Sequence, residues 1–153
     1  MTELKRILLV EDNANDVALT LAALEETHLA NEVVVVRDGQ QALDFLRRRG
    51  PYADRPDGHP AVVLLDLKLP KVDGLEVLAQ VKSDPELKAI PIVMLTSSRE
   101  EQDLTRSYGL GVNAYVVKPV AFPDFVEALK DLGLFWAVVN QPPPGALSRG
   151  GER

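Results

Sequence analysis

The chain contains no cysteine among its 153 residues. A disulfide scaffold, a thiolate metal site and a cysteine nucleophile are therefore excluded, and the composition fits a reducing compartment. Long apolar runs are missing as well, because runs such as Ala61–Leu65 are far shorter than the roughly 20 residues of a membrane helix. The N-terminus turns acidic early and lacks the apolar core and cleavage site of a signal peptide. We therefore expect a cytoplasmic protein without a membrane partner.

Basic residues are fewer than acidic ones, 17 Lys and Arg against 23 Asp and Glu, so the formal net charge is −6. This balance argues against a protein that holds nucleic acid or an anionic membrane through phosphate contacts. Hydrophobic residues at 46% and charged residues at 26% are ordinary globular values, which excludes wholesale disorder. We expect one domain over residues 1–140, followed by a disordered Pro- and Gly-rich tail over residues 141–153.

Short apolar runs alternate with segments of helical period, the pattern of βαβ units on a parallel sheet buried on both faces. The fold class expected is therefore α/β. A loop over Gly50–Pro60 is expected to form no regular element, because it is rich in Pro and Gly. The five expected strands are Arg6–Val10, Val33–Val36, Ala61–Leu65, Ile92–Leu95 and Ala114–Val117. The helical stripes between them are Val17, Leu21 and Leu24; Ala42, Leu43, Phe45 and Leu46; Leu75, Val77, Leu78 and Val81; Glu100–Leu110; and a last helix from about Pro123.

Polar residues follow four of the expected strands at their carboxyl ends, where open parallel sheets gather their functional groups. If the strands lie side by side, three carboxylates, a hydroxyl and an ammonium meet in one crevice. One ammonium offsets only one of three carboxylates, so the crevice should bind a hard divalent cation, for which Mg²⁺ is the best candidate. The residues concerned are Glu11 and Asp12, Asp66, Thr96-Ser97-Ser98, and Lys118-Pro119.

Asp66 is the natural nucleophile, because it ends the apolar run AVVLLD. With the cation bound, a phosphoryl group can approach a carboxylate that would otherwise repel it. The hydroxyl of Thr96 can donate to one phosphoryl oxygen, and Lys118 can pair with another. The predicted chemistry is phosphoryl transfer to an aspartate.

This set of residues resembles the receiver domain of bacterial response regulators in two-component signalling, over about residues 4–140. The family pattern is an acidic pair, the motif D-x-x-[ML]-P-x-x-D-G, a Ser or Thr, and Lys-Pro. The resemblance implies a flavodoxin-like (βα)5 doubly wound sheet, with five parallel strands in the order 2-1-3-4-5 and helices on both faces. The chain offers Glu11-Asp12, then Asp66 to Gly74 as DLKLPKVDG, then Thr96, then Lys118-Pro119.

The resemblance also implies a set of metal ligands. Asp12, Asp66 and the backbone carbonyl of Lys68 would bind Mg²⁺ directly, and Glu11 would contribute through water. A cis peptide bond before Pro119 would aim the preceding lysine.

A switch is implied as well, formed by Thr96 and Tyr115. Because side chains alternate along a strand, Tyr115 is expected to point away from Lys118, toward the fourth helix or solvent. When phosphorylation draws Thr96 inward, Tyr115 can fill the space that opens.

By this resemblance the chain accepts a phosphoryl group on Asp66 from a sensor histidine kinase, with Mg²⁺ as its cofactor. It signals by changing conformation, without an output domain. Self-catalysed phosphotransfer and slow autodephosphorylation are its only chemistry, so it is not expected to be an enzyme. The loop RRRGPYADRPDGHP, the Thr96-Ser97-Ser98 triplet and the ending DLGLFWAVVNQPPP are similar to small regulators paired with phytochrome-type kinases, which makes such a kinase the expected partner.

The segment Leu132–Val139 is too apolar for one face of an amphipathic helix. Leu134, Phe135 and Val138 should project partly away from the core and leave a patch that a monomer would expose. We therefore expect a homodimer built on the C-terminal helix.

Two other functions stay open at this stage. A Mg-dependent phosphatase that works on small substrates through an aspartyl-phosphate would carry a second Asp two residues after the nucleophile, where this chain has Lys68. A phosphorylation-independent pseudo-receiver would bind partners only. Nicotinamide binding fits less well, because EDNAND and not a Gly-rich turn follows the first strand.

Two further segments have plain structural interpretations. Gly74 is expected to supply a positive φ before the third helix. Arg47-Arg48-Arg49 is expected to be a solvated helix end whose cations favour the C-terminal dipole.

Overall fold

The computed structural model describes residues 6–26, 33–55, 58–97, 101–117, 123–124 and 126–127. Five parallel strands form one sheet with the order β2-β1-β3-β4-β5, which confirms the expected fold class and strand order. The strands are β1 (Ile7–Val10), β2 (Val33–Val36), β3 (Val62–Leu65), β4 (Ile92–Thr96) and β5 (Ala114–Val117). The helices are α1 (Ala14–Glu26), α2 (Gly39–Arg47), the 3₁₀ helix η2 (Gly50–Tyr52), α3 (Gly74–Ser83) and α4 (Glu101–Gly109).

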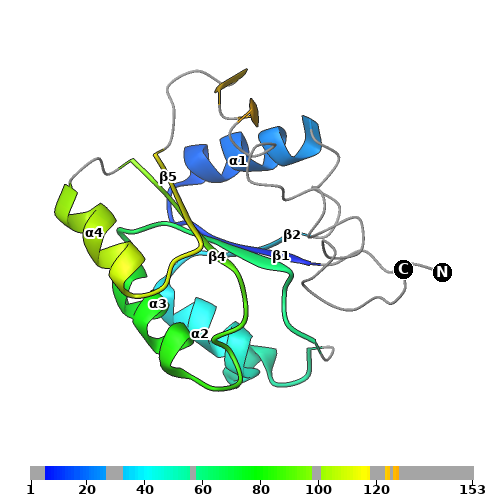
Figure 1. Ribbon diagram of the computed structural model, residues 1–153. Helices are drawn as coiled ribbons and strands as arrows, with labels where there is room; N and C mark the ends of the chain where they lie inside the picture. The colour runs from blue at the N-terminus through cyan, green and yellow to red at the C-terminus, as the bar shows by residue number, and fades with distance from the viewer. Residues whose placement is uncertain are drawn as a thin grey trace, which may run out of the picture.

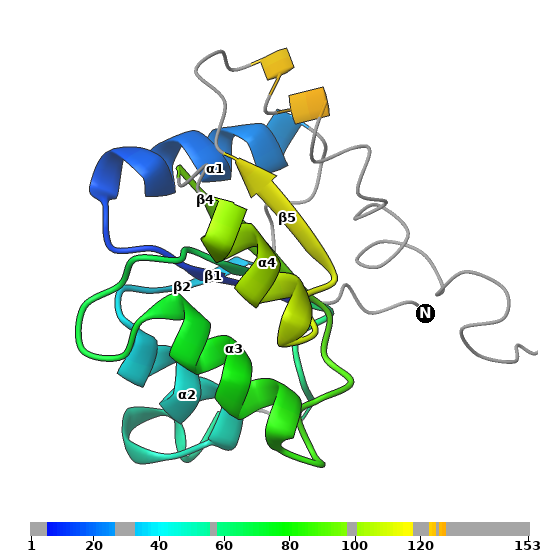
Figure 2. The ribbon, with the colours of Figure 1, turned by 60° about the vertical axis from the view of Figure 1, so that its left-hand side comes forward.

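The two faces of the sheet bury separate apolar clusters, because successive side chains of a strand point to opposite faces. In β1, Leu8 and Val10 join the cluster formed with α2 and α3, whereas Ile7 and Leu9 join the cluster formed with α1. Figure 1 shows α1 on one side of the sheet and α2 and α3 on the other. In Figure 2, α3 lies between α2 and α4. Burial on both faces explains why the strands are continuous apolar runs.

The register of the central strands places their carboxyl ends level. Val10 of β1 aligns with Leu65 of β3. The backbone ladder continues one residue further, since Glu11 N–H donates to Val36 O at 3.0 Å and Asp66 N–H donates to Val10 O at 3.0 Å. The side chains of Glu11 and Asp66 therefore extend from backbone positions that are adjacent and held by hydrogen bonds.

Three of the described helices that begin at this carboxyl edge of the sheet have a polar side chain that accepts a backbone N–H in the first turn. Asn13 Oδ1 accepts from Asp16 N–H at 3.0 Å in the first turn of α1. Asp38 caps α2 through Gln41 N–H at 2.7 Å, and Asp73 caps α3 through Glu76 N–H at 2.9 Å. Such caps satisfy donors that a helix start leaves unpaired.

The loop before β3 is more ordered than its composition predicts. It contains η2, and the side chain of Arg55 is buried within it. Arg55 donates to Phe45 O at 2.6 Å, to Gly58 O at 2.8 Å and to Leu46 O at 3.4 Å, and its guanidinium lies 4.4 Å from the centre of the Phe45 ring. The expectation of no regular element here was wrong, because one buried cation organises the loop around the end of α2.

Gly74 also differs from its expectation. It is the first residue of α3 and is not among the described residues with positive φ. A Cβ at this position would overlap the carbonyl oxygen of Asp66 and lie 2.8 Å from Leu67 Cα. The positive-φ prediction was therefore wrong, and glycine is needed because α3 begins against the end of β3.

The arginine triplet only partly forms a solvated helix end. Arg48 and Arg49 are exposed, and Arg48 closes α2 in the left-handed conformation with φ 57°. Arg47 is half-buried and donates from Nη1 to Gln80 Oε1 of α3 at 3.1 Å. The first arginine of the triplet thus joins α2 to α3.

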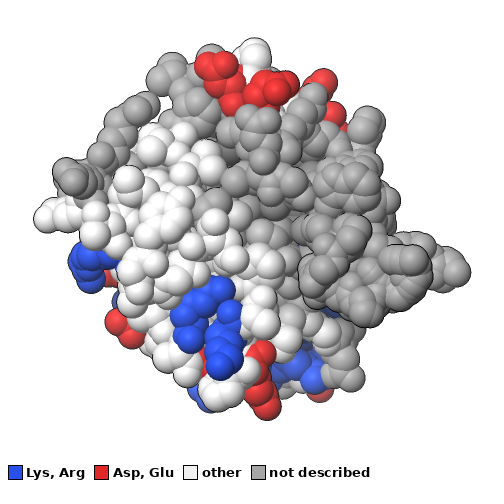
Figure 3. Space-filling model, viewed as in Figure 1, with Lys and Arg blue, Asp and Glu red and all other residues white. Residues whose placement is uncertain are grey.

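Charge is distributed unevenly over the surface. The α1 helix carries Asp16, Glu25 and Glu26 and has no Lys or Arg. In Figure 3, the basic side chains of the described residues lie in the lower half with acidic ones among them, whereas the charged side chains at the upper margin are acidic. None of the described helices combines the length and apolarity that crossing a membrane requires.

Candidate functional site

Three carboxylates meet at the carboxyl edge of the sheet. Glu11 and Asp12 follow β1, Asp66 follows β3, and one oxygen from each lies within 4.8 Å of the others. Negative charges this close repel one another unless a cation or a proton intervenes. Several oxygen donors in such a small volume are the ligands that a hard divalent cation takes. The described residues therefore fit a divalent metal site.

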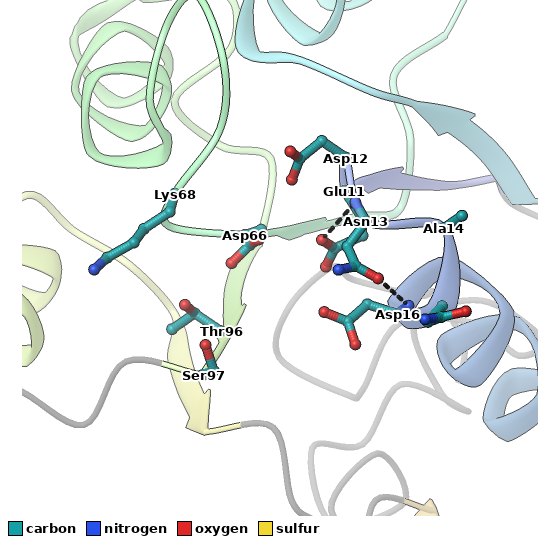
Figure 4. A pocket seen from close by; sticks show the side chains of 10 residues that line it. Glu11, Asp12, Asn13, Ala14, Asp16, Asp66, Lys68, Thr96 and Ser97 are labelled. Atoms are coloured by element: carbon teal, nitrogen blue, oxygen red, sulfur yellow. Dashed lines mark hydrogen bonds between the residues drawn. The ribbon is translucent and has the colours of Figure 1, made fainter.

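The carboxylates open into a polar depression of about 540 Å³. Asn13, Asp16, Lys68, Thr96 and Ser97 also line it. Figure 4 shows the carboxylates of Glu11 and Asp66 on opposite sides of its centre, with the side chains of Thr96 and Ser97 below Asp66. The depression is thus open to a small group that approaches Asp66, and an anionic group would need a cation to offset the carboxylates.

The Asp66 side chain is held in a defined orientation. The residue is 8% exposed and sits between two buried leucines, Leu65 and Leu67. Its Oδ1 accepts the Leu67 N–H at 2.8 Å. Glu11 is 2% exposed, and its Oε2 accepts the Asn13 N–H at 3.2 Å. Backbone donors therefore orient both carboxylates.

Thr96 is the last residue of β4 and is 1% exposed. It pairs in register with Val117, the last residue of β5. Ser98, two residues after the end of β4, and Lys118 and Pro119, which follow β5, lie outside the described residues. The convergence of Thr96 with the carboxylates is thus described, and the predicted roles of Lys118 and Pro119 stay predictions.

Lys68 lines the depression, and Tyr115 lies on β5 outside its lining. The Lys68 side chain is exposed and extends away from Glu11 in Figure 4. Tyr115 is half-buried against the cluster of α2 and α3, whereas Val116 packs on the opposite face with α1. Tyr115 therefore faces the side of the sheet that the alternation of the strand predicts.

Three polar residues that line the depression escaped the sequence-based prediction, namely Asn13, Asn15 and Asp16. An Asn directly before an amphipathic run is a helix-start signal, which could have placed Asn13 at this edge. The predicted dimer patch, Leu134, Phe135 and Val138, and the predicted tail over 141–153 lie outside the described residues.

Comparison with known proteins assigns the family. The family model described as the response regulator receiver domain matches residues 7–130. The chain is 42% identical over 132 residues to the response regulator Rcp1 of Synechocystis sp., covering 86% of this chain and 88% of that protein. A structure of Rcp1 in its Mn²⁺-bound form has a TM-score of 0.79 at 41% identity, covering 92% of this chain and 99% of that chain.

Two further solved structures are similar. The bacteriophytochrome response regulator RtBRR is 66% identical with a TM-score of 0.78, covering 94% of this chain and 86% of that chain. The phosphorylated cyanobacterial phytochrome response regulator RcpA is 44% identical with a TM-score of 0.81, covering 93% of this chain and 100% of that chain. The matched residues, the sheet order and the carboxylate cluster agree, and the chain belongs to the receiver family of two-component response regulators.

Proposed function

We propose that this receiver accepts a phosphoryl group on Asp66 from the phosphohistidine of a sensor histidine kinase. The bond from phosphorus to the histidine nitrogen breaks as the bond to an Asp66 carboxylate oxygen forms. The observation that carries the proposal is the convergence of Asp66 with Glu11 and Asp12 in an open polar depression. The Leu67 N–H holds one carboxylate oxygen and so orients the group for attack.

Mg²⁺ is the proposed cofactor. Asp12, Asp66 and the backbone carbonyl of Lys68 would hold it directly, and Glu11 would act through water. When bound, the ion neutralises negative charge and acts as a Lewis acid at a phosphoryl oxygen. Without it, the carboxylate cluster would repel the incoming group.

Two further side chains are proposed to act on the phosphoryl oxygens. Thr96 would donate its hydroxyl to one, and Lys118 would pair with another, aimed by a cis bond to Pro119. Thr96 is almost fully buried, so its movement toward the phosphoryl group would alter packing at the end of β4. Tyr115 on β5 would respond to that movement and complete the switch.

The signalling partner is proposed to be a phytochrome-type histidine kinase, because the chain is similar to RtBRR and RcpA, which are named as phytochrome response regulators. The output would pass through the surface of the receiver itself. A homodimer through Leu134, Phe135 and Val138 is part of this proposal. The phosphoryl group would leave by slow self-catalysed hydrolysis.

The experiment is labelling with acetyl phosphate, followed by intact-protein mass spectrometry. The wild-type protein should gain one phosphoryl group only when Mg²⁺ is present, and Asp66→Asn should gain none. Asp54→Asn is the matched control, since Asp54 is exposed in the loop before β3 and should label like the wild type. Labelled Asp66→Asn would overturn the proposal, and a wild-type protein that never labels would favour the pseudo-receiver.

A further inference from the structure

One residue of the β3–α3 loop, Lys71, has a strained backbone. Lys71 has φ 69°, and Val72 N–H donates to Pro70 O at 2.8 Å, which closes a γ-turn around it. Among the described residues, the other non-Gly position with positive φ is Arg48, whose conformation is that of a helix C-cap. Lys71 caps no helix. Strain of this kind persists only where the surrounding structure holds it.

The start of α2 supplies the contacts that hold the turn. Gly39 N–H donates to Pro70 O at 3.4 Å, and a Cβ on Gly39 would overlap the carbonyl oxygen of Val72. Oδ2 of Asp38 lies 3.8 Å from the Lys71 ammonium, and Asp38 is only 6% exposed. Asp38 and Gly39 therefore contact three successive loop residues.

The same loop is fixed at its ends by the site and by α3. Gly74 N–H donates to Leu67 O at 2.7 Å, and Gly74 packs against the Asp66 carbonyl. Lys68 lies between Leu67 and Gly74 along the chain, the two residues that this hydrogen bond joins. A displacement of the γ-turn is therefore transmitted to the backbone that would present the Lys68 carbonyl.

We propose that Asp38 and Gly39 are positioning residues for the cation, and that their contacts with the γ-turn set the affinity of the site for Mg²⁺. This inference rests on the proposed Mg²⁺ site. Neither residue would touch the ion. Each holds the loop whose backbone and whose Asp66 side chain would bind it, as outer partners of metal ligands commonly do.

The first test is the Gly39→Ala variant of the full chain, titrated with MgCl₂ by calorimetry. The added methyl must push α2 and the turn apart, so the Kd for Mg²⁺ should rise roughly tenfold. At saturating Mg²⁺, the limiting rate of labelling by acetyl phosphate should return close to the wild-type value. Gly109→Ala is the matched control, because its added Cβ would meet no atom within 4 Å.

The Lys71→Gln variant distinguishes a role of Lys71 in positioning the loop from a direct effect of its charge on Mg²⁺ affinity. Removing a positive charge near a cation site should tighten Mg²⁺ binding if charge alone matters. The positioning role predicts the opposite, a weaker affinity, because the turn loses its tether to Asp38. Lys88→Gln is the control, since it makes the same charge change at an exposed position beyond α3. Asp38→Asn keeps the helix cap and should also weaken binding.

The outcomes are distinct. Weaker Mg²⁺ binding by Gly39→Ala and Lys71→Gln, with both controls unchanged, supports the inference. Wild-type affinity in both variants, or tighter binding by Lys71→Gln, overturns the inference and leaves the proposed function standing. A wild-type protein that binds no Mg²⁺ overturns both. Thermal melting shows whether Gly39→Ala is folded, and Lys71→Gln keeps the test decisive if it is not.

Discussion

The two edges of the sheet use charge in opposite ways. At the amino edge, the ammonium of Lys82 donates to Lys88 O at 3.1 Å and Ile90 O at 2.9 Å, and Arg55 donates to carbonyls at the end of α2. At the carboxyl edge, Asp38 and Asp73 accept N–H groups at helix starts. This division follows from helix polarity, because each helix runs back against the strands and brings its carbonyls to one edge and its N–H groups to the other.

The carboxyl edge has more charge than helix capping requires. Glu11, Asp12 and Asp66 are three carboxylates in one small volume, and none of them is an N-cap of a described helix. Lys82 and Arg55 at the amino edge, by contrast, donate to carbonyl oxygens of the protein. Charge that exceeds the needs of the fold thus coincides with the candidate ligand site.

The largest effect on stability is expected at the amino edge. Arg55→Ala should lower the free energy of unfolding by about 2–4 kcal/mol, because it removes charge-assisted hydrogen bonds and a cation–π contact. Urea denaturation measures this loss. Mg²⁺ affinity should not change. Arg49→Ala, at an exposed neighbour, should stay within about 0.5 kcal/mol of the wild type; equal losses in both variants would contradict the structural role of Arg55.

Gly74→Ala, at the carboxyl edge, should lower both the stability of the protein and its rate of labelling. Its methyl group would collide with the Asp66 carbonyl, so the free energy of unfolding should fall by about 1–3 kcal/mol. Because the collision involves the end of β3, labelling by acetyl phosphate should slow as well. Gly109→Ala again serves as the control. If the variant loses stability but labels at the wild-type rate, the start of α3 does not position Asp66 for the reaction.

Asp66→Asn should change stability in the opposite direction. Without Mg²⁺, removing one of three neighbouring negative charges should raise the free energy of unfolding by on the order of 1 kcal/mol. With Mg²⁺ at about 100 times its Kd, the wild type should gain about 2.7 kcal/mol and the variant much less, so the ranking should reverse. Thermal melts with and without the ion measure this, and Asp54→Asn should show neither change.

The smallest effect concerns Lys82, because burial lowers the pKa of its ammonium below the usual lysine value of 10.5. The unfolded chain then binds more protons than the folded chain as the pH approaches 10.5, so this group makes the protein relatively more stable as the pH rises. The difference in unfolding free energy between the wild type and Lys82→Met should shift in favour of the wild type from pH 8 toward pH 10.5. Urea titrations over this range measure it, and a shift toward Lys82→Met would contradict the sign.

Much of this architecture could be predicted from the sequence. The apolar runs located all five strands to within one residue, because strands buried on both faces leave an unbroken pattern. The carboxylates could be placed together because parallel strands end at one edge. These inferences depend on periodicity and topology, which the sequence carries directly.

Contacts that depend on a tertiary partner could not be predicted. The sequence shows Arg55 only as one polar residue in a Pro-rich loop, and its burial depends on the Phe45 ring and on the carbonyls at the end of α2. The close approach of Gly39 to Val72 and of Gly74 to Asp66 depends on where two helices dock. No local pattern encodes these distances.

The pairing of β1 with β3 has a consequence for folding. Ile7 aligns with Val62, and α1, β2, α2 and η2 lie between them in the chain. Asp12 and Asp66 are neighbours only after this long-range pairing, whose loop-closure entropy makes it slow to form. A cation held by these carboxylates would therefore have no site on the collapsing chain. It would bind only after the centre of the sheet has assembled, and so it would stabilise the product of folding and not its early intermediates.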